Sequence, residues 1–260
     1  MIIAMITGAL KRWVQAVQEF TFLLVDSVRH LFSPPRYLVD TLMQMDVIGF
    51  GSLPIVLLIG FFTGGVLALQ SYRTLSTFGE VGLMGKVVAL SLVLELGPVL
   101  TALMMAGRNS SGIASEIGSM VVSEQVDAMR ALGTDPSKKL VTPRVIASMV
   151  MLFFLTVISD FFGVLGGAMS AGVLLGLDMH QYLNNAWQSL KFADIFMGLA
   201  KPVFFGFIVA SIGCYYGLSA RGGTQGVGRA TTQAVVASSV FMIIFDFLLT
   251  RLLMVVLPGL

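Results

Sequence analysis

The sequence has 260 residues, of which 56% are hydrophobic and only 12% carry a charge. Soluble domains carry about 25% charged residues, so this composition excludes an ordinary soluble protein and indicates an integral membrane protein. The net charge of +2 gives no basic surface of the kind that binds nucleic acid, and we expect no nucleic-acid partner. The single cysteine, Cys214, excludes a disulfide framework.

The amino-terminal region, which we place at residues 1–45, contains a predicted amphipathic helix at residues 11–32. Apolar residues such as Trp13, Phe20 and Leu24 recur on one face of this helix, and most charged residues fall on the other. Charges interrupt the segment too often for it to cross hydrocarbon. We therefore expect a helix that lies in the membrane interface.

Five hydrophobic runs follow, and each exceeds the roughly 20 residues that a helix needs to cross a bilayer. We therefore expect an all-α integral membrane protein with a five-span domain over residues 46–260. The third run is longer than one crossing needs, so either it tilts strongly or its end forms a separate turn. Pro98 removes a backbone donor from the second span and should bend it. The predicted spans are 48–69, 87–106, 145–177, 195–218 and 232–257, and the loop between the last two is predicted at 219–231.

The longest polar passage, residues 107–136, separates the second span from the third. Its apolar residues recur at roughly helical spacing, and Ser110 and Ser111 offer N-cap oxygens. Gly133, followed closely by Pro136, indicates the end of a helix. The pattern predicts one short amphipathic helix between the two spans, although a solvated helical loop would have the same pattern.

The acidic residues of this passage favour contact with a protein over contact with a membrane surface. Anionic lipid attracts Lys and Arg, whereas this segment carries several carboxylates. A helix that enters the groove of a partner uses a few apolar anchors, with charges around them that fix its register. Rigid attachment at both ends would come from Arg108 and from residues 133–136. The residues assigned to this contact are Arg108, Glu116, Ile117, Met120, Val121, Glu124, Asp127 and Asp135.

The distribution of Lys and Arg predicts the orientation of the chain. Eleven of them flank one side of the five spans and three flank the other. Because basic residues concentrate on the cytoplasmic side, the amino terminus and residues 107–136 are expected in the cytoplasm. Five spans then place the carboxyl terminus on the opposite side.

Four charged residues lie within the hydrophobic runs: Glu95, Asp160, Lys201 and Asp246. An isolated charge there costs about 2.5–3.5 kcal/mol even on a lenient insertion scale, so pairing is expected. At 1.5 Å per residue, Glu95, Lys201 and Asp246 lie about 14, 9 and 16 Å below the outer surface and could meet. Asp160 has no obvious partner. The cluster of three either joins helices or takes part in the handling of a substrate.

The sequence argues against a catalytic centre. It contains no G-x-x-x-x-G-K-[ST] motif, so this chain is not expected to hydrolyse ATP by that route. Neither Asp160 nor Asp246 is flanked by glycine as in an intramembrane aspartyl protease. His30 and His180 fall on opposite sides of the membrane, which disfavours Ser-His-Asp chemistry and a histidine metal site. We expect no catalytic residue, no metal and no cofactor in this chain.

Two long sequence stretches resemble a known family. The stretch LVLELGPVLTALMMAGRNSSGIASEIGSM, followed by SEQVDAMRALGTDP, is similar to the MlaE (YrbE-like) permeases of ABC transporters that work with MCE-domain proteins. The shared pattern comprises E-x-G-P, A-G-R, A-x-E-I-G-x-M, E-Q-x-D-A and G-x-D-P. Later matches include Pro143-Arg144, Lys201, GVGRATTQAVV and Asp246, so the resemblance covers the chain from about Asp46 onward.

The resemblance implies a homodimeric permease in the inner membrane of a Gram-negative bacterium. It implies a separate cytoplasmic ATPase that binds ATP and Mg, docked on residues 107–136 as the coupling helix. The partners that it further implies are a periplasmic ring of MCE-domain protein and a small cytoplasmic accessory protein of STAS type. The implied activity is phospholipid movement between the inner and outer membranes, which maintains outer-membrane lipid asymmetry. Two alternatives stay open: a permease for a sterol or another hydrophobic substrate, and a non-transporting anchor for the MCE ring.

Overall fold

The computed structural model describes residues 18–26, 29 and 37–256, and every regular element within them is helical. The expected all-α architecture is therefore confirmed. The elements after the short helix at residues 18–26 are α2 (Leu38–Thr77), η1 (Val81–Leu83), α3 (Met84–Ser91), η2 (Leu92–Leu96), α4 (Gly97–Met105), η3 (Ala106–Ser110), α5 (Ser111–Val122), α6 (Gln125–Ala131), η4 (Ser137–Val141), α7 (Thr142–Met169), η5 (Ser170–Leu174), α8 (Met179–Ser189), α9 (Phe192–Leu218) and α10 (Gly223–Val256).

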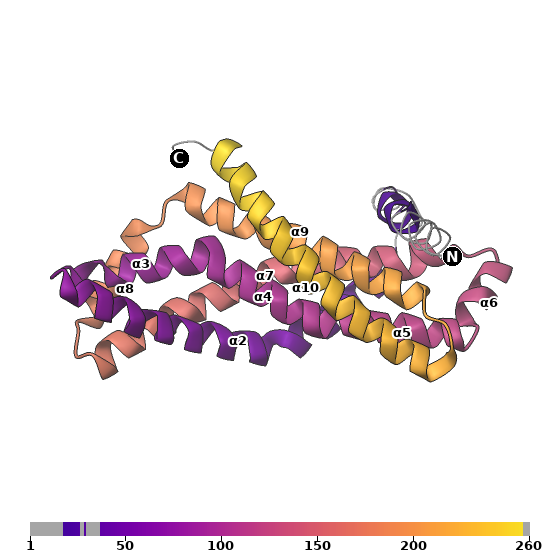
Figure 1. The fold of residues 1–260 in the computed structure, drawn as a ribbon, viewed down its shortest axis with the longest axis horizontal. Coiled ribbons are helices and arrows are strands. Elements are labelled where there is room, and N and C mark those ends of the chain that lie inside the picture. The colour runs from indigo at the N-terminus through magenta and orange to yellow at the C-terminus, as the bar shows by residue number, and fades with distance from the viewer. Residues whose placement is uncertain (1–17, 27–28, 30–36, 257–260) are drawn as a thin grey trace, which may run out of the picture.

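Five helical stretches are long and apolar enough to cross a membrane, which confirms the five predicted spans. They run along the long axis of the molecule, with α3 and α8 at one end and α5 and α6 at the other (Figure 1). The longest would measure about 60 Å at 1.5 Å per residue, twice the thickness of the hydrocarbon layer. Their ends therefore project beyond it. The five stretches are Leu38–Thr77, Val81–Val122, Ser137–Leu174, Phe192–Leu218 and Gly223–Val256.

The span boundaries differ from the sequence prediction, most of all in the second span, which runs from Val81 to Val122. The first helix begins at Leu38, so the boundary that we placed at residue 45 falls inside it. The third span continues through a π-helical turn to Leu174, and its end does not form a separate turn. The last two spans are joined by residues 219–222 alone. There Gly222 adopts a φ of +93°, which reverses the chain at once and lets α10 start earlier than predicted.

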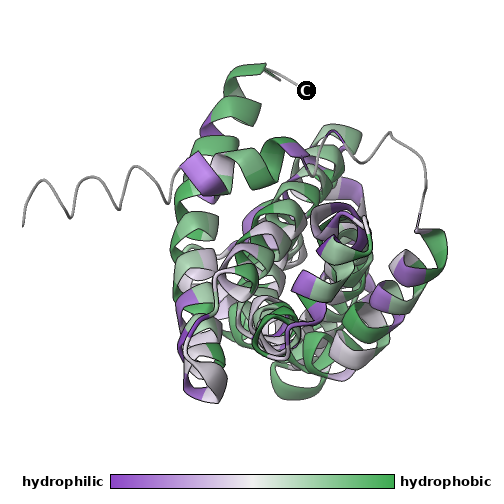
Figure 2. Cartoon of the chain, turned by 90° about the vertical axis from the view of Figure 1, so that its right-hand side faces the viewer, coloured by the Kyte–Doolittle hydropathy of each residue, from purple (hydrophilic) through white to green (hydrophobic). Residues whose placement is uncertain are grey.

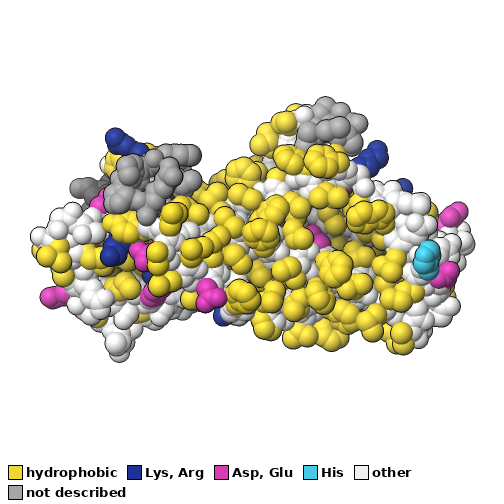
Figure 3. Space-filling model, turned by 180° about the vertical axis from the view of Figure 1, so that it is seen from behind, with side chains coloured by type: hydrophobic (Ala, Val, Ile, Leu, Met, Phe, Trp, Pro, Cys, Tyr) yellow, Lys and Arg dark blue, Asp and Glu magenta, His cyan; other side chains and the backbone are white. Residues whose placement is uncertain are grey.

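The surface of the bundle is hydrophobic along its middle. Yellow hydrophobic side chains cover this region in Figure 3, and the charged side chains gather toward the two ends. Viewed along the bundle, most ribbon segments on the outside are coloured as hydrophobic (Figure 2). A hydrophobic belt between two polar ends is the surface that a bilayer requires of a helical protein.

Helices α2 and α7 are packed backbone to backbone through glycine. A Cβ on Gly64 would overlap the carbonyl oxygen of Gly163, and one on Gly166 would overlap that of Phe61. Small residues permit this close approach. Within a bilayer the hydrophobic effect does not drive helices together, and the van der Waals contacts of close packing hold them instead. At the same end of α7, Tyr182 of α8 covers Gly167. Burial raises the pKa of Tyr182 well above its ordinary value, so its phenol stays neutral.

A methyl group at Gly64 should separate these two helices. We expect Gly64→Ala to lower stability by about 1–3 kcal/mol, the usual cost of overpacking, because the obstructing atom is backbone and cannot rotate away. Gly228→Ala on α10 is the matched control, since a Cβ there meets nothing within 4 Å and alanine favours a helix. Thermal unfolding in detergent measures both. A Gly64→Ala protein as stable as the control would contradict this account of the packing.

The short amino-terminal helix lies against the α5–α6 end of the molecule (Figure 1). The rings of Phe20 and Tyr215 meet edge to face with centroids 5.5 Å apart. Leu23 packs on the buried cluster that contains Ile117 and Cys214. This helix covers residues 18–26, while residues 11–17 and 30–32 of the predicted one lie outside the described residues. Its expected place in the membrane interface stays a prediction.

Candidate functional site

Three of the intramembrane charges meet at one point of the structure. The ammonium Nζ of Lys201 on α9 lies 2.6 Å from Oε2 of Glu95 on η2. The same nitrogen lies 3.3 Å from Oδ1 of Asp246 on α10, a distance typical of an ion pair. The cluster formed by Glu95, Lys201 and Asp246 therefore joins three helices inside the hydrophobic belt, as the depth estimate suggested.

The backbone around Pro98 explains why this cluster forms where it does. Pro98 has no N–H to donate to the carbonyl of Leu94 four residues earlier, and the helix takes a π-helical form over Leu92–Leu96. Lys201 donates to that Leu94 carbonyl at 3.0 Å. Gly198 lets α9 come this close, since a Cβ there would overlap the carbonyl oxygen of Val93. One ammonium group thus donates to a backbone carbonyl and to Glu95, and it forms an ion pair with Asp246.

The two acids of the cluster are more accessible than the cation between them. The Lys201 side chain is 2% exposed, whereas Glu95 is 42% and Asp246 is 20% exposed. The hydroxyl of Thr250 donates to Oε1 of Glu95 at 3.2 Å. Sequence reasoning missed Thr250, although its position one turn after Asp246 on α10 was a usable signal. With all three groups ionised, the cluster has a net charge of −1. Its open side, where Glu95 and Asp246 are exposed, can receive a polar group.

Helix α10 leaves most of its apolar surface without a neighbour among the residues that the structure describes. Only 6% of its most hydrophobic window is buried, against at least 33% for the other four spans. In Figure 1 it crosses the bundle obliquely, and its last turns stand away from the other helices. This surface lies on the helix that carries Asp246 and Thr250. Its exposed large residues are Val236, Val240, Phe241, Ile243, Ile244, Phe245, Phe247, Leu248, Leu252, Met254, Val255 and Val256.

Asp160 on α7 lies apart from this cluster. Its Oδ1 is buried without a hydrogen-bond partner and points at Gly97, where a Cβ would overlap it. Among the described residues, this oxygen has no partner of the kind that Lys201 gives Glu95. The residue also borders an apolar cavity of about 420 Å³ between α7, α8 and α9.

The single amphipathic helix predicted between the second and third spans is not what the structure contains. The helix of the second span continues without a cap through Ser110 and Ser111 to Val122. The hydroxyl of Ser111 donates back to the carbonyl of Gly107 at 2.6 Å, as a serine inside a helix does. The prediction was wrong because both serines have helical backbone angles and so cannot start a helix.

The break in this segment comes at Glu124, which separates α5 from α6. Glu124 has a φ of +59° and is the one non-glycine residue with positive φ among the described residues. A left-handed residue ends the hydrogen-bonded helix, and the chain turns into the short α6. Gly133, at a φ of +75°, ends α6 as predicted.

The residues that we assigned to a partner contact fall into two groups. Ile117 is fully buried among Val141, Cys214 and other residues of this chain, so it is not an exposed anchor. Met120 and Val121 are half-buried, Arg108 donates to the carbonyl of Gly51, and Glu116 binds Arg144. The other three, Glu124, Asp127 and Asp135, lie on the exposed surface around the break, where Asp127 binds Arg130 and Asp135 accepts from the N–H of Ser137. Two residues that we had not assigned, Val122 and Leu132, are also exposed there, and Leu132 is 83% exposed.

Arg144 attaches α5 to the start of the third span. Its guanidinium lies 2.8 Å from Oε1 of Glu116 and donates to the carbonyl of Leu140 at 2.8 Å. The Arg144 side chain is 5% exposed, whereas that of Glu116 is 46% exposed. The sequence contained Pro143-Arg144 as a motif, but no spacing rule indicated a partner 28 residues away.

This difference in burial predicts an asymmetry between two substitutions. Glu116→Ala should destabilise the protein by about 3 kcal/mol, because it leaves a buried guanidinium without its carboxylate. Arg144→Met should cost less, since solvent can reach the remaining carboxylate. Thermal unfolding of the two variants in one detergent makes the comparison. A larger loss for Arg144→Met would mean that the Arg144 side chain acts through packing and not through its charge.

Comparisons with known proteins agree on one family. The sequence model described as Permease MlaE matches residues 41–252. A probable ABC transporter permease protein of Rickettsia typhi is 44% identical over 242 residues, which cover 93% of each chain. The intermembrane phospholipid transport system permease protein MlaE of Haemophilus influenzae is 36% identical over 81% of each chain. The chloroplastic protein TRIGALACTOSYLDIACYLGLYCEROL 1 of Arabidopsis thaliana is 39% identical over 81% of this chain and 60% of the relative.

Proposed function

The chain belongs to the MlaE family of ABC transporter permeases, and we propose that it moves phospholipid between the inner and outer membranes, driven by a separate ATPase. The observation that carries this proposal is the cluster of Glu95, Lys201 and Asp246 beside the uncovered apolar face of α10. The open side of the cluster offers hydrogen-bonding and charged groups to a polar head. The apolar face beside it offers a surface for acyl chains. An amphiphile needs both in one place.

The same surface of α10 supports a homodimer. An apolar helix with so little burial within its own chain needs either lipid or a second protein surface to cover it. In a twofold dimer α10 would pack near its own copy, and the two clusters would face a shared pathway. In this proposal the dimer lies in the inner membrane of a Gram-negative cell. The phospholipid movement that it carries out maintains the lipid asymmetry of the outer membrane.

The surface around Glu124 supports the ATPase partner. The break between α5 and α6 places exposed acids beside the exposed Leu132, which is the composition of a protein contact and not of a lipid contact. A periplasmic MCE ring and a cytoplasmic STAS-type protein complete the proposed assembly. ATP and Mg bind to the ATPase in this proposal.

The test of the function is ATP-dependent lipid movement by the reconstituted complex. The permease and its co-purified ATPase are placed in proteoliposomes that contain a fluorescent phospholipid, and transfer to acceptor MCE protein or vesicles is followed. We expect transfer with ATP and none with a non-hydrolysable analogue. Transfer of a sterol in place of phospholipid, or no transfer with an intact complex, would contradict the proposal.

The proposed orientation gives a separate prediction. Cys214 is fully buried and serves as a silent background for an impermeant thiol reagent. A cysteine at the exposed Gln188 of α8 should react in intact cells, because this segment is expected in the periplasm. A cysteine at the exposed Thr224 should react only after lysis. Labelling of Thr224→Cys in intact cells would reverse the topology.

A further inference from the structure

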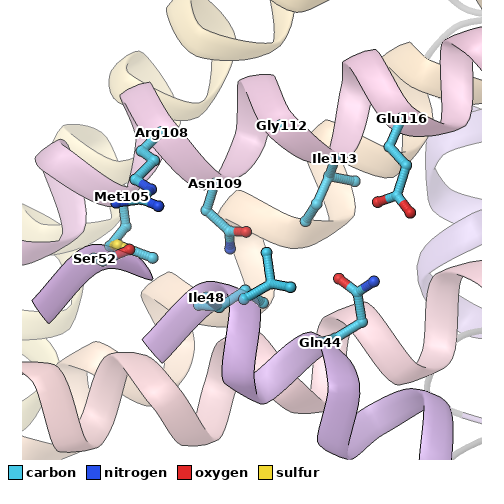
Figure 4. Close-up of a pocket in the computed structure, with 10 residues that line it drawn as sticks. Gln44, Ile48, Ser52, Met105, Arg108, Asn109, Gly112, Ile113 and Glu116 are labelled. Carbon is cyan, nitrogen blue, oxygen red and sulfur yellow. The ribbon is translucent and has the colours of Figure 1, made fainter. Parts of the chain in front are cut away.

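A polar cavity of about 240 Å³ lies between α2 and the continuous helix of α4, η3 and α5 (Figure 4). It is separate from the charge cluster, which none of its lining residues joins. Ser52 and Gln44 of α2 face Arg108, Asn109 and Glu116 of the opposite helix across this cavity. Apolar side chains form the remaining wall.

One buried group in this wall lacks a partner. Ser52 is fully buried, and its hydroxyl makes no hydrogen bond. A buried hydroxyl without a partner is unfavourable, and a native structure that keeps one often places it toward a ligand. Figure 4 shows Ser52 and Arg108 at the same end of the cavity, on facing helices. A group that accepts hydrogen bonds would satisfy both side chains.

The cavity lining carries one cation, Arg108, and one carboxylate, Glu116. Arg144, a buried residue outside the lining, pairs with Glu116 at a distance of 2.8 Å and balances its charge. Within the described part of the chain, no carboxylate forms an ion pair with Arg108, whose contact is with the carbonyl of Gly51. A guanidinium has five donors, so Arg108 retains several for an anion. The favoured ligand is therefore an anion with several oxygen acceptors.

The position of the cavity indicates where this anion comes from. Beside it, α2 exposes Val47 and Phe50, which are 63% and 74% exposed and belong to the hydrophobic surface. The cavity therefore adjoins both this apolar surface and the end of the second span that basic residues place in the cytoplasm. At this depth in a bilayer the anions are the phosphates of lipid head groups.

We propose that this cavity binds the phosphate of a phospholipid head group from the cytoplasmic leaflet. Arg108 donates to two phosphate oxygens, Ser52 donates to a third, and the acyl chains lie along Val47 and Phe50. Guanidinium geometry matches phosphate oxygens in this way. The inference rests on the proposed function only for the identity of the transported molecule. It gives the pathway a loading site about half a bilayer away from the charge cluster.

The experiment uses the complex of the full-length permease with its ATPase in nanodiscs that contain ³²P-labelled phospholipid. The photo-reactive residue p-benzoylphenylalanine replaces Val47, and irradiation transfers the label to the permease. We expect Arg108→Gln to reduce labelling by about tenfold or more, because it removes a charged donor. Ser52→Ala should reduce it by about threefold, the effect of one neutral hydrogen bond. Ser52→Ala should also leave thermal stability unchanged or higher, since the hydroxyl that it removes is unsatisfied.

The control is Arg229→Gln, which removes an exposed arginine of α10 outside this cavity and should not change labelling. Equal labelling of all variants would overturn the inference, because it would show ordinary contact with surrounding lipid. A cross-link to a second copy of the permease in place of lipid would overturn it as well. Loss of the lipid label with excess inorganic phosphate would mean that the site takes a soluble anion.

The outcome is independent of the transport assay. If the wild-type complex moves phospholipid but labelling does not depend on Arg108, the inference fails and the proposed function stands. If labelling depends on Arg108 and Ser52 but the complex moves no phospholipid, the site stands and the proposed function fails.

Discussion

Lys201→Met is expected to cost about 3–5 kcal/mol of stability and to abolish transport. The substitution keeps the length of the side chain but leaves Glu95 and Asp246 as two carboxylates without a cation in the hydrophobic belt. It also leaves the Leu94 carbonyl without the donor that replaces the N–H missing from Pro98. Thermal unfolding in detergent and lipid transfer in proteoliposomes measure the two effects. Protonation of one acid would relieve part of the loss, so the cost should fall at lower pH.

Two further variants distinguish the effect of the lost charge from the effect of changed packing. Lys86→Met, an exposed lysine on α3, should change neither stability nor transport. The triple variant Glu95→Gln, Lys201→Met, Asp246→Asn should recover most of the stability, because no unpaired charge remains, but it should not recover transport. A triple variant with full transport would show that the cluster only joins helices. Full stability of Lys201→Met alone would disprove the pairing.

Glu124→Lys is expected to release the ATPase and to stop ATP-driven transport while the permease still folds. Glu124 lies at the break between α5 and α6 and is exposed, so reversal of its charge changes the contact surface without disturbing a buried group. Loss of one charge pair at an interface commonly lowers affinity by about 2–5 kcal/mol when the partner charge stays unpaired. Co-purification of the ATPase with the tagged permease measures retention, and lipid transfer measures coupling.

Leu132→Asp should act in the same direction, because it places a carboxylate where an 83% exposed leucine offers an apolar anchor. Asp46→Lys is the control for Glu124→Lys, since it also replaces an acid by a lysine, on an exposed residue of α2 away from this break. If both Glu124→Lys and Leu132→Asp retain the ATPase and transfer lipid at the wild-type rate, residues 107–136 are not the coupling segment.

Hydropathy alone predicted the five spans because each hydrophobic run is long enough for one crossing. The meeting of Glu95, Lys201 and Asp246 was also predictable, since a bilayer leaves few alternatives to pairing. Glu95 and Lys201 needed only a depth estimate along the second and fourth spans, which cross the membrane in the same direction. The same reasoning gave Asp160 no partner, and the structure shows none for its Oδ1.

The failures come from features that have no local signature. Ser110 and Ser111 are good N-caps by residue type, yet the helix runs through them because Met105 before them and Ile113 after them pack in the buried core. The pairing of Glu116 with Arg144 depends on how the second and third spans are placed in space. Thr250 becomes recognisable as part of the cluster only in the folded structure, where its hydroxyl donates to Glu95. The helix continuity, the ion pair and the hydrogen bond all depend on tertiary contacts, which a single sequence does not reveal.

The continuity of the second helix through Val122 makes it a lever arm. About 29 residues separate Glu95 from Glu124, which corresponds to a rod of about 44 Å. A tilt of about 5° imposed at one end would shift the other by about 4 Å, enough to open or close an ion pair. The rod is interrupted only by the π-helical turns at Leu92–Leu96 and Ala106–Ser110, where backbone hydrogen bonding is already irregular. Motion at the Glu124 end would therefore bend this helix at these two turns, the nearer at Ala106–Ser110 and the farther at the turn that holds Glu95.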